Sequence, residues 1–242
     1  MYSPIRSAPA STAWPATAGA AAVAATGRTA LVAGATGLVG REILQGLLAD
    51  DRVRAVHVLA RRPLEFEHAK LTTHVVDFAA LGALPPVDEA YLALGTTIKV
   101  AGSQSAFRAV DFDANLAVAC AAQVAGASRL GLVSAMGADA HSSLFYSRVK
   151  GELEEALTGL GFAGLVIARP SMLAGDRPAL GQPERSGEQL ALKVSRWLKP
   201  VIPANYRSVA ARDVAAALLR EVPVATGKKV LLSGEMQPLA SE

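Results

Sequence analysis

The sequence predicts an α/β protein built on a doubly wound parallel sheet with helices on both faces. Short apolar runs typical of buried strands alternate along the chain with longer helix-like segments. This alternation is the pattern of successive βαβ units, which form parallel sheets. Because the crossovers of such units are right-handed, they wind the sheet in both directions from its first strand. A glycine-rich loop joins the first apolar run to the first helix-like segment, as expected at the start of such a fold.

The expected elements follow one another from residue 29 onward. The strands are, in order, Thr29–Ala33, Ala55–Leu59, His74–Val76, Ala90–Leu94, Leu130–Ser134, Leu165–Ala168 and Val230–Leu232. The helices are Val39–Leu48, Phe107–Ala125, Leu144–Leu160, Gln189–Trp197 and Asp213–Leu219. A proline-rich region interrupts the alternation after the sixth strand. We therefore expect a single domain over residues 27–242, with a small C-terminal lobe, mainly residues 170–208, that covers the substrate.

Composition and charge favour a soluble globular protein. Of the 242 residues, 51% are hydrophobic and 19% charged, and the net charge is +3. The basic residues are scattered rather than gathered in a stripe, so we expect no nucleic-acid partner. No apolar run reaches the ~18 residues of a membrane-spanning helix, so we expect no membrane partner. Cys120 is the one cysteine; we expect it to be a small buried residue of an alanine-rich helix. The acidic and histidine residues lack metal-ligand spacing, and we expect no metal.

Residues 1–26 differ in composition from the rest of the chain. They are rich in Ala, Ser, Thr and Pro and contain no acid, so they lack the apolar periodicity needed to bury a face and are expected to be a disordered tail. A transit peptide is an alternative, but such peptides are rich in arginine and this segment contains only Arg6. The sequence therefore predicts a cytoplasmic protein.

The loop after the first strand contains Gly34, Gly37 and Gly40, each three residues from the next. In a dinucleotide-binding turn, the first glycine makes the turn, the second admits the pyrophosphate and the third lets helix and strand pack closely. The phosphates then lie at the helix N-terminus, where free N–H groups and the helix dipole favour an anion. A phosphate-binding loop of the nucleotide triphosphatases is excluded, because no Gly-Lys-Ser/Thr follows. The turn predicts a Rossmann fold.

Several motifs together resemble the short-chain dehydrogenase/reductase superfamily. "GATGLVG" at 34–40 is similar to the extended and atypical branches, and "YSRVK" at 146–150 to the superfamily's tyrosine–lysine motif. "LGTT" at 94–97, "SAMGA" at 134–138 and "ARPSMLAGDR" at 168–177 add a likeness to atypical members related to the Tat-interacting protein oxidoreductases. The resemblance covers residues 28–233, and the order and spacing of its motifs are more specific than any one of them.

The resemblance implies a nicotinamide dinucleotide. The end of the second strand meets the adenosine ribose, where an acid favours NAD and an arginine favours NADP. Arg61 and Arg62 stand there, with no acid before Glu65, so we expect NADP rather than NAD. The expected cofactor-binding residues are Gly34, Thr36, Gly37, Leu38, Val39, Arg61, Arg62, Asp77, Phe78, Leu94, Gly95, Thr96, Tyr146, Lys150 and Pro170.

Tyr146 and Lys150 are spaced to share one face of a helix. A neighbouring ammonium stabilises a phenolate, which suits the tyrosine to move a proton to or from a carbonyl or alcohol oxygen. Ser134 ends the fifth strand and is expected to steady that oxygen. The expected catalytic residues are thus Ser134, Tyr146 and Lys150. The chain departs from many relatives at Asp111, where they have asparagine, and Asn115 follows one turn later.

Three functions are compatible with these motifs. The first is an NADP-dependent reductase of a small carbonyl compound, acting as a monomer or homodimer. The second is a sugar-nucleotide epimerase or dehydratase, which the short C-terminal lobe and the missing second-strand acid disfavour. The third is a non-catalytic NADP(H)-binding regulator, which the Ser-Tyr-Lys set disfavours. The sequence does not identify the substrate.

Overall fold

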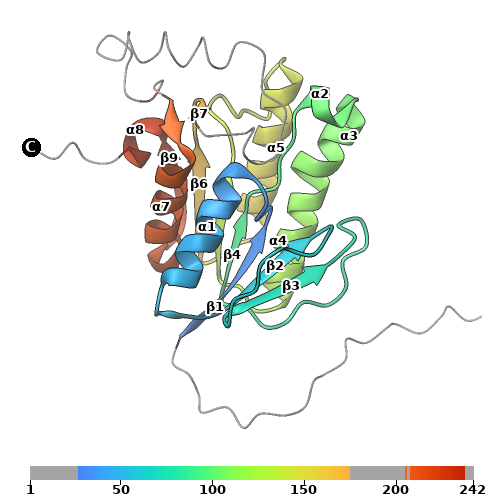
Figure 1. The fold of residues 1–242 in the computed structure, drawn as a ribbon. Helices are drawn as coiled ribbons and strands as arrows, with labels where there is room; N and C mark the ends of the chain where they lie inside the picture. Colours follow the sequence, from blue (N-terminus) through green and yellow to red (C-terminus); the bar gives the residue numbers. More distant parts are fainter. Residues whose placement is uncertain (1–26, 175–204, 206–207, 238–242) are drawn as a thin grey trace, which may run out of the picture.

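The computed structural model describes residues 27–174, 205 and 208–237 (Figure 1). The expected tail of residues 1–26, the expected helix Gln189–Trp197 and most of the expected lobe lie outside these residues. The fold below is that of the described part.

Seven strands form one parallel sheet in the order β3-β2-β1-β4-β5-β6-β9. They are β1 (Arg28–Ala33), β2 (Val53–Ala60), β3 (Leu71–Val75), β4 (Glu89–Leu92), β5 (Arg129–Val133), β6 (Gly164–Arg169) and β9 (Gly227–Leu232). All seven expected strands are present, with ends shifted by a few residues. The chain reverses its direction of travel across the sheet between β1 and β4, so the predicted doubly wound fold is confirmed. In such sheets ligands bind beside the carboxyl ends of the strands at this reversal.

Helices cover both faces of the sheet (Figure 1). On one face, α1 (Leu38–Ala49) and α7 (Ala211–Glu221) pack side by side and bury an aliphatic cluster that includes Ile43, Leu47 and Leu218. On the other, α4 (Asn115–Val124) and α5 (Phe145–Gly159) bury a second cluster with Leu92, Leu130 and Leu153. The central strands β1, β4, β5 and β6 are buried on both sides, which explains why they read as largely apolar runs rather than alternating ones.

The helix expected over Phe107–Ala125 is interrupted. It consists of α3 (Gln104–Arg108), a π-helical turn η1 (Ala109–Ala114) and α4. A π turn widens the helix and leaves carbonyls without their usual i+4 donors, and it occurs often at functional sites. Periodicity in the sequence did not reveal it, because each of its residues is compatible with an ordinary helix.

Smaller elements complete the described fold. A short helix α2 (Ile98–Ala101) precedes α3, and β7 (Leu173–Ala174) pairs with β8 (Val209–Ala210) in a separate two-stranded sheet. A 3₁₀ turn η4 (Val222–Val224) follows α7, and α8 (Ser233–Met236) follows β9.

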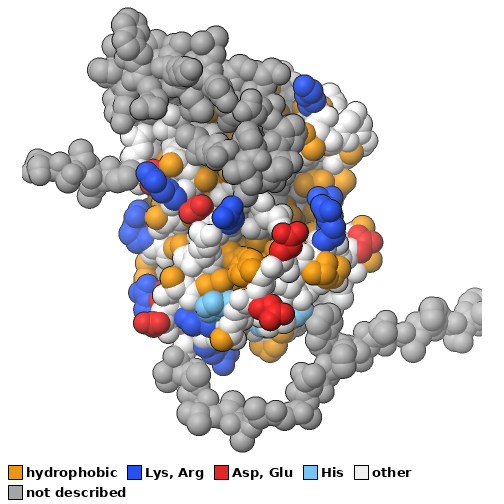
Figure 2. All heavy atoms as spheres, viewed as in Figure 1, with side chains coloured by type: hydrophobic (Ala, Val, Ile, Leu, Met, Phe, Trp, Pro, Cys, Tyr) orange, Lys and Arg blue, Asp and Glu red, His pale blue; other side chains and the backbone are white. Residues whose placement is uncertain are grey.

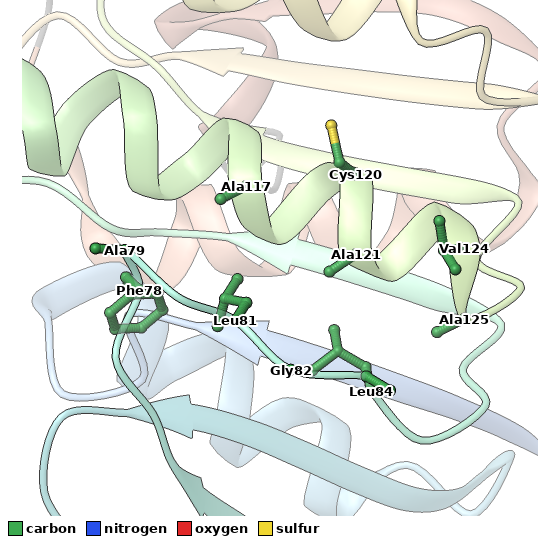
Figure 3. Close-up of a pocket in the computed structure, with 11 residues that line it drawn as sticks. Phe78, Ala79, Leu81, Gly82, Leu84, Ala117, Cys120, Ala121, Val124 and Ala125 are labelled. Carbon is green, nitrogen blue, oxygen red and sulfur yellow. The ribbon is translucent and has the colours of Figure 1, made fainter. Parts of the chain in front are cut away.

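The outer face of α4 borders a shallow apolar groove of about 480 Å³, whose other side is formed by residues 78–84 (Figure 3). Cys120 lies on this face and is exposed, so the prediction that it is buried is wrong. The alanine-rich composition of α4 suggested burial on every side. The buried residues of α4 are Asn115, Val118, Ala119 and Ala122, and Cys120 is not among them.

Charged side chains of both signs are interspersed over the face seen in Figure 2. His57 of β2 and His74 of β3 face each other at the β2–β3 edge of the sheet, with His57 Nδ1 and His74 Nε2 2.9 Å apart. Burial, and secondarily the nearby His74, lowers the pKa of His57 to about 4. His57 is therefore neutral at physiological pH.

Candidate active site

The three glycines between β1 and α1 have different structural roles. Gly34 has a positive φ of 91°, and a Cβ there would lie 2.4 Å from the Ala93 backbone. A Cβ on Gly40 would lie 2.0 Å from the Gly34 carbonyl oxygen. Gly37 has an ordinary extended backbone, and its nearest obstacle would be the Gly34 oxygen at 3.3 Å. The fold itself therefore requires glycine at 34 and 40, whereas Gly37 keeps the space above the turn open.

Gly37 is also the N-cap residue of α1, and no side chain caps this helix N-terminus. The first N–H groups of a helix have no partner within the helix. Thr36 is exposed at the turn, and Leu38 is partly buried beside it. Together the open turn and the uncapped helix form a cradle for an anion such as a pyrophosphate.

The residues expected around the adenosine lie at neighbouring strand ends. Arg61 and Arg62 follow β2 directly and are exposed, and none of the ion pairs among the described residues involves them. Asp77 follows β3; its carboxylate accepts the Ala79 N–H at 2.9 Å. Phe78 is partly buried next to it. Both arginines are thus free to meet an anion.

The loop after β4 is tied to the π-helical turn by two side chains. The Thr96 N–H donates to Asp111 Oδ2 at 2.8 Å. The Asn115 Nδ2 donates at 3.2 Å to three carbonyls, those of Leu94, Val110 and Asp111. Asn115 thereby satisfies carbonyls that the π turn releases and joins them to the end of β4. Through these hydrogen bonds the π-helical turn holds residues 94–96, which are expected to lie beside the nicotinamide.

Tyr146 and Lys150 lie in the first turns of α5, as expected. The Tyr146 ring packs against Phe107 of α3 with 5.6 Å between ring centroids and remains 38% exposed. Lys150 is buried, and its Nζ lies 2.7 Å from Asp111 Oδ1. This contact is an ion pair without the angles of a hydrogen bond. The tyrosine is thus accessible to a substrate, whereas the lysine is buried with a carboxylate partner.

Ser134 directly follows β5 and is buried, with an exposed fraction of 5%. Its hydroxyl donates to Glu154 Oε1 at 2.5 Å. Arg169, at the end of β6, donates to the same carboxylate through Nε at 3.0 Å and Nη2 at 2.6 Å. This hydrogen bonding raises the pKa of Arg169. The Ser134 proton is therefore engaged by Glu154, and its oxygen retains only an acceptor role for another group.

The Ser134–Glu154–Arg169 network sets the position of α5 on the sheet, because it joins this helix to the ends of β5 and β6. A Cβ on Gly151 would lie 2.1 Å from the Ala140 backbone nitrogen, so α5 also packs closely on the loop after β5. Pro170 is buried and its carbonyl accepts the Met136 N–H at 2.9 Å. Glu154 was not among the site residues predicted from the sequence. Its signal was present: Tyr146, Lys150 and Glu154 are successive i+4 positions, so they form one polar stripe on α5.

The described residues contain neither a metal-binding cluster nor a membrane-spanning helix. No group of three His, Cys, Asp or Glu side chains among them could hold a metal ion. Within the same residues, no helix has the length and hydropathy needed to cross a membrane.

Comparison with known proteins gives relatives that match from somewhat over half to most of the chain. The protein fmp52, mitochondrial, of Emericella nidulans is 40% identical over 154 residues, which are 60% of this chain and 66% of that protein. The protein HTATIP2 of Rattus norvegicus is 33% identical over 215 residues, covering 86% of this chain and 87% of the relative. No protein-family model matches the chain.

Solved structures share the fold at low identity. MoeE5 in complex with UDP-glucose and NAD superposes with a TM-score of 0.64 and 18% identity, over 84% of this chain and 75% of that one. A short chain dehydrogenase family protein from Francisella tularensis gives a TM-score of 0.63 at 12% identity, over 86% of this chain and 98% of that one. These likenesses concern the fold.

One expectation is overturned by the comparisons. Several fungal relatives, including those of Emericella nidulans, Coccidioides immitis and Candida albicans, are named mitochondrial. The predicted cytoplasmic localisation is therefore wrong. That prediction relied on the rule that transit peptides are rich in arginine, whereas residues 1–26 contain only one. The mitochondrial relatives show that this rule is not sufficient here.

Proposed function

The chain belongs to the family of FMP52 and HTATIP2, atypical members of the short-chain dehydrogenase/reductase superfamily, and from this premise we propose that it is an NADP(H)-dependent oxidoreductase of a small carbonyl compound. The family supports a nicotinamide dinucleotide as the cofactor. The names of the fungal relatives support a mitochondrial place of action.

One observation carries the proposal: the open cradle at Gly37. Gly34 and Gly40 are explained by the protein's own backbone, but Gly37 has a backbone that any residue adopts, and its Cβ would meet a single tight contact, the Gly34 oxygen at 3.3 Å. A glycine there is explained by a ligand whose pyrophosphate approaches the backbone. The uncapped N-terminus of α1 provides the N–H donors for that anion. The turn thus fits a dinucleotide.

Arg61 and Arg62 support NADP over NAD. They are exposed at the end of β2, next to the strand that carries the glycine turn. A guanidinium binds a phosphate through two parallel N–H donors. An acid at this position, which would favour a ribose 2′-hydroxyl, is absent from residues 60–64.

The dinucleotide would supply or accept the hydride. Tyr146 would donate a proton to the carbonyl oxygen that becomes charged, or take one from an alcohol, because its side chain is 38% exposed beside the site. Lys150 lies one turn further along the same face. Two of its three N–H groups would remain for ribose hydroxyls while Asp111 balances its charge.

A second candidate is a regulatory dinucleotide-binding protein with little catalysis. It is favoured by Ser134, whose proton is engaged by the buried Glu154 rather than directed at a substrate oxygen. A nucleotide-sugar enzyme is a third candidate, because MoeE5, which shares the fold, holds UDP-glucose and NAD.

The test measures NADPH and NADH binding to the parent, then turnover with aldehydes, ketones, quinones and UDP-glucose. We expect NADPH to bind more tightly, and Arg61→Ala with Arg62→Ala to remove that preference. We expect Tyr146→Phe to lower turnover by about 10²–10⁴-fold, a larger effect than on NADPH binding, since the proton donor is lost while the ring remains. Tight NADPH binding without turnover of any substrate supports the regulatory candidate. Absence of dinucleotide binding refutes the proposal.

A further inference from the structure

Asp111 is the most deeply buried acidic side chain at the candidate site, with 1% exposed. Its two oxygens contact two different parts of that site: Oδ1 lies 2.7 Å from Lys150 Nζ, and Oδ2 accepts the Thr96 N–H. A carboxylate is stable at such depth only when both its charge and its lone pairs are compensated. The proposed function assigns Lys150 to the cofactor ribose, and Thr96 is one of the residues 94–96 expected beside the nicotinamide.

We propose that Asp111 is a positioning residue for the nicotinamide end of the site, which fixes Lys150 and Thr96 together and whose negative charge favours the oxidised dinucleotide over the reduced one. The inference rests on the proposed function. It deepens that function by assigning a residue that controls which redox form of the cofactor is bound.

The geometry makes Asp111 difficult to replace. A carboxylate offers one oxygen to each partner, whereas the isosteric amide of asparagine offers one oxygen and a donor. Asparagine at 111 would serve either Lys150 or the Thr96 N–H and present its own N–H₂ to the other. Asn115 holds the π turn to the β4 loop through three carbonyls. The backbone at 111 is therefore restrained from moving to relieve the mismatch.

The charges determine the effect on the cofactor. Lys150 and Asp111 form a pair of zero net charge, so the site carries no excess positive charge from the buried lysine. The oxidised nicotinamide ring is cationic and the reduced ring is neutral, while the rest of the dinucleotide is the same. Removal of the carboxylate charge adds one positive charge to the site. It should weaken the oxidised form more than the reduced form, by about three- to tenfold for charges several ångströms apart in a partly solvated site.

The first experiment examines the pair without any cofactor. Asp111→Asn, Lys150→Met and the double variant are compared with the parent by urea denaturation. Each single substitution leaves one buried charge without its partner and should lower stability. The double variant removes both charges, so its loss should be smaller than the sum of the two single losses. Additive losses would show that the two side chains do not interact and would overturn the positioning role.

The second experiment measures dissociation constants for NADP⁺ and NADPH by titration calorimetry. In Asp111→Asn the ratio of the two constants, oxidised over reduced, should rise about three- to tenfold. Asp111→Glu retains the charge, so its ratio should stay near that of the parent even if both affinities fall. Asp113→Asn is the matched control, because Asp113 is exposed on the same π turn.

An unchanged ratio in Asp111→Asn would overturn the electrostatic role, since a merely structural defect weakens both redox forms alike. Equal changes in Asp111→Asn and Asp113→Asn would also overturn it. If the parent binds neither form, the proposed function fails and the electrostatic role fails with it. The double-mutant cycle still decides the positioning of Lys150 in that case, so the two failures are distinguishable.

Discussion

Alanine at Gly37 and alanine at Gly40 should have opposite consequences, although the two positions are three residues apart. At Gly40 the new Cβ would lie 2.0 Å from the Gly34 oxygen and 2.6 Å from its carbonyl carbon. These are backbone atoms, and Gly34 is itself fixed against Ala93. The N-terminus of α1 must shift by more than 1 Å to relieve the contact, which by analogy with overpacked cores costs about 2–4 kcal/mol.

At Gly37 the new Cβ would lie 3.3 Å from the Gly34 oxygen, with no further contact below 3.9 Å. Its φ of −82° and ψ of 169° are accessible to alanine. The unfolded-state gain from Gly→Ala offsets much of the cost of losing a favoured helix-capping residue and of the tight contact with the Gly34 oxygen, so stability should fall by only about 1 kcal/mol. The methyl group would occupy the space for a pyrophosphate. Loss of one or two charge-assisted hydrogen bonds, about 1.5–3 kcal/mol each, corresponds to a 10- to 100-fold or greater loss of NADPH affinity.

The assay combines urea denaturation with NADPH titration for the parent and both variants. We expect Gly40→Ala to be destabilised, and Gly37→Ala to be nearly as stable as the parent yet deficient in NADPH binding. A Gly37→Ala variant that binds NADPH as tightly as the parent would refute the assignment of this space to the pyrophosphate. An equally stable Gly40→Ala variant would refute the close approach of α1 to the turn.

Two further predictions concern stability. Glu154→Gln should lower the free energy of unfolding by about 2–4 kcal/mol, because Arg169 loses its charged partner in a pair that is largely buried. Glu155→Gln, at an exposed position, is the control. Equal losses in the two variants would contradict the role of the Glu154–Arg169 pair. The lowered pKa of His57 means that the unfolded chain binds a proton between pH 6.5 and about 4 that the folded protein does not. Stability should therefore fall as the pH decreases through this range, by about 2 kcal/mol after allowance for partial exposure. Urea denaturation of His57→Gln should show a smaller loss of stability over the same range. An identical pH dependence in the parent and the variant would argue against a neutral His57–His74 pair.

Local pattern was sufficient to predict the strands, the glycine turn and the helix that carries Tyr146 and Lys150. The central strands are buried on both faces, so each is a largely apolar run bounded by polar or turn residues. The turn is a local feature of seven residues, and the tyrosine and lysine share a face because of the helical repeat alone. These features depend on neighbours in the sequence, which a single chain displays directly.

The tertiary structure alone decided which polar groups meet at the site. Lys150 pairs with Asp111, 39 positions earlier, and Ser134 donates to Glu154, 20 positions later. Both contacts depend on how α5 packs against the ends of β5 and β6 and against the π turn after α3. The π turn itself is stabilised by Asn115 reaching the end of β4, a long-range contact with no helical periodicity. The sequence determined which groups are available for chemistry; the packing of separate elements determined that Asp111 balances the buried lysine and that Glu154 engages the serine.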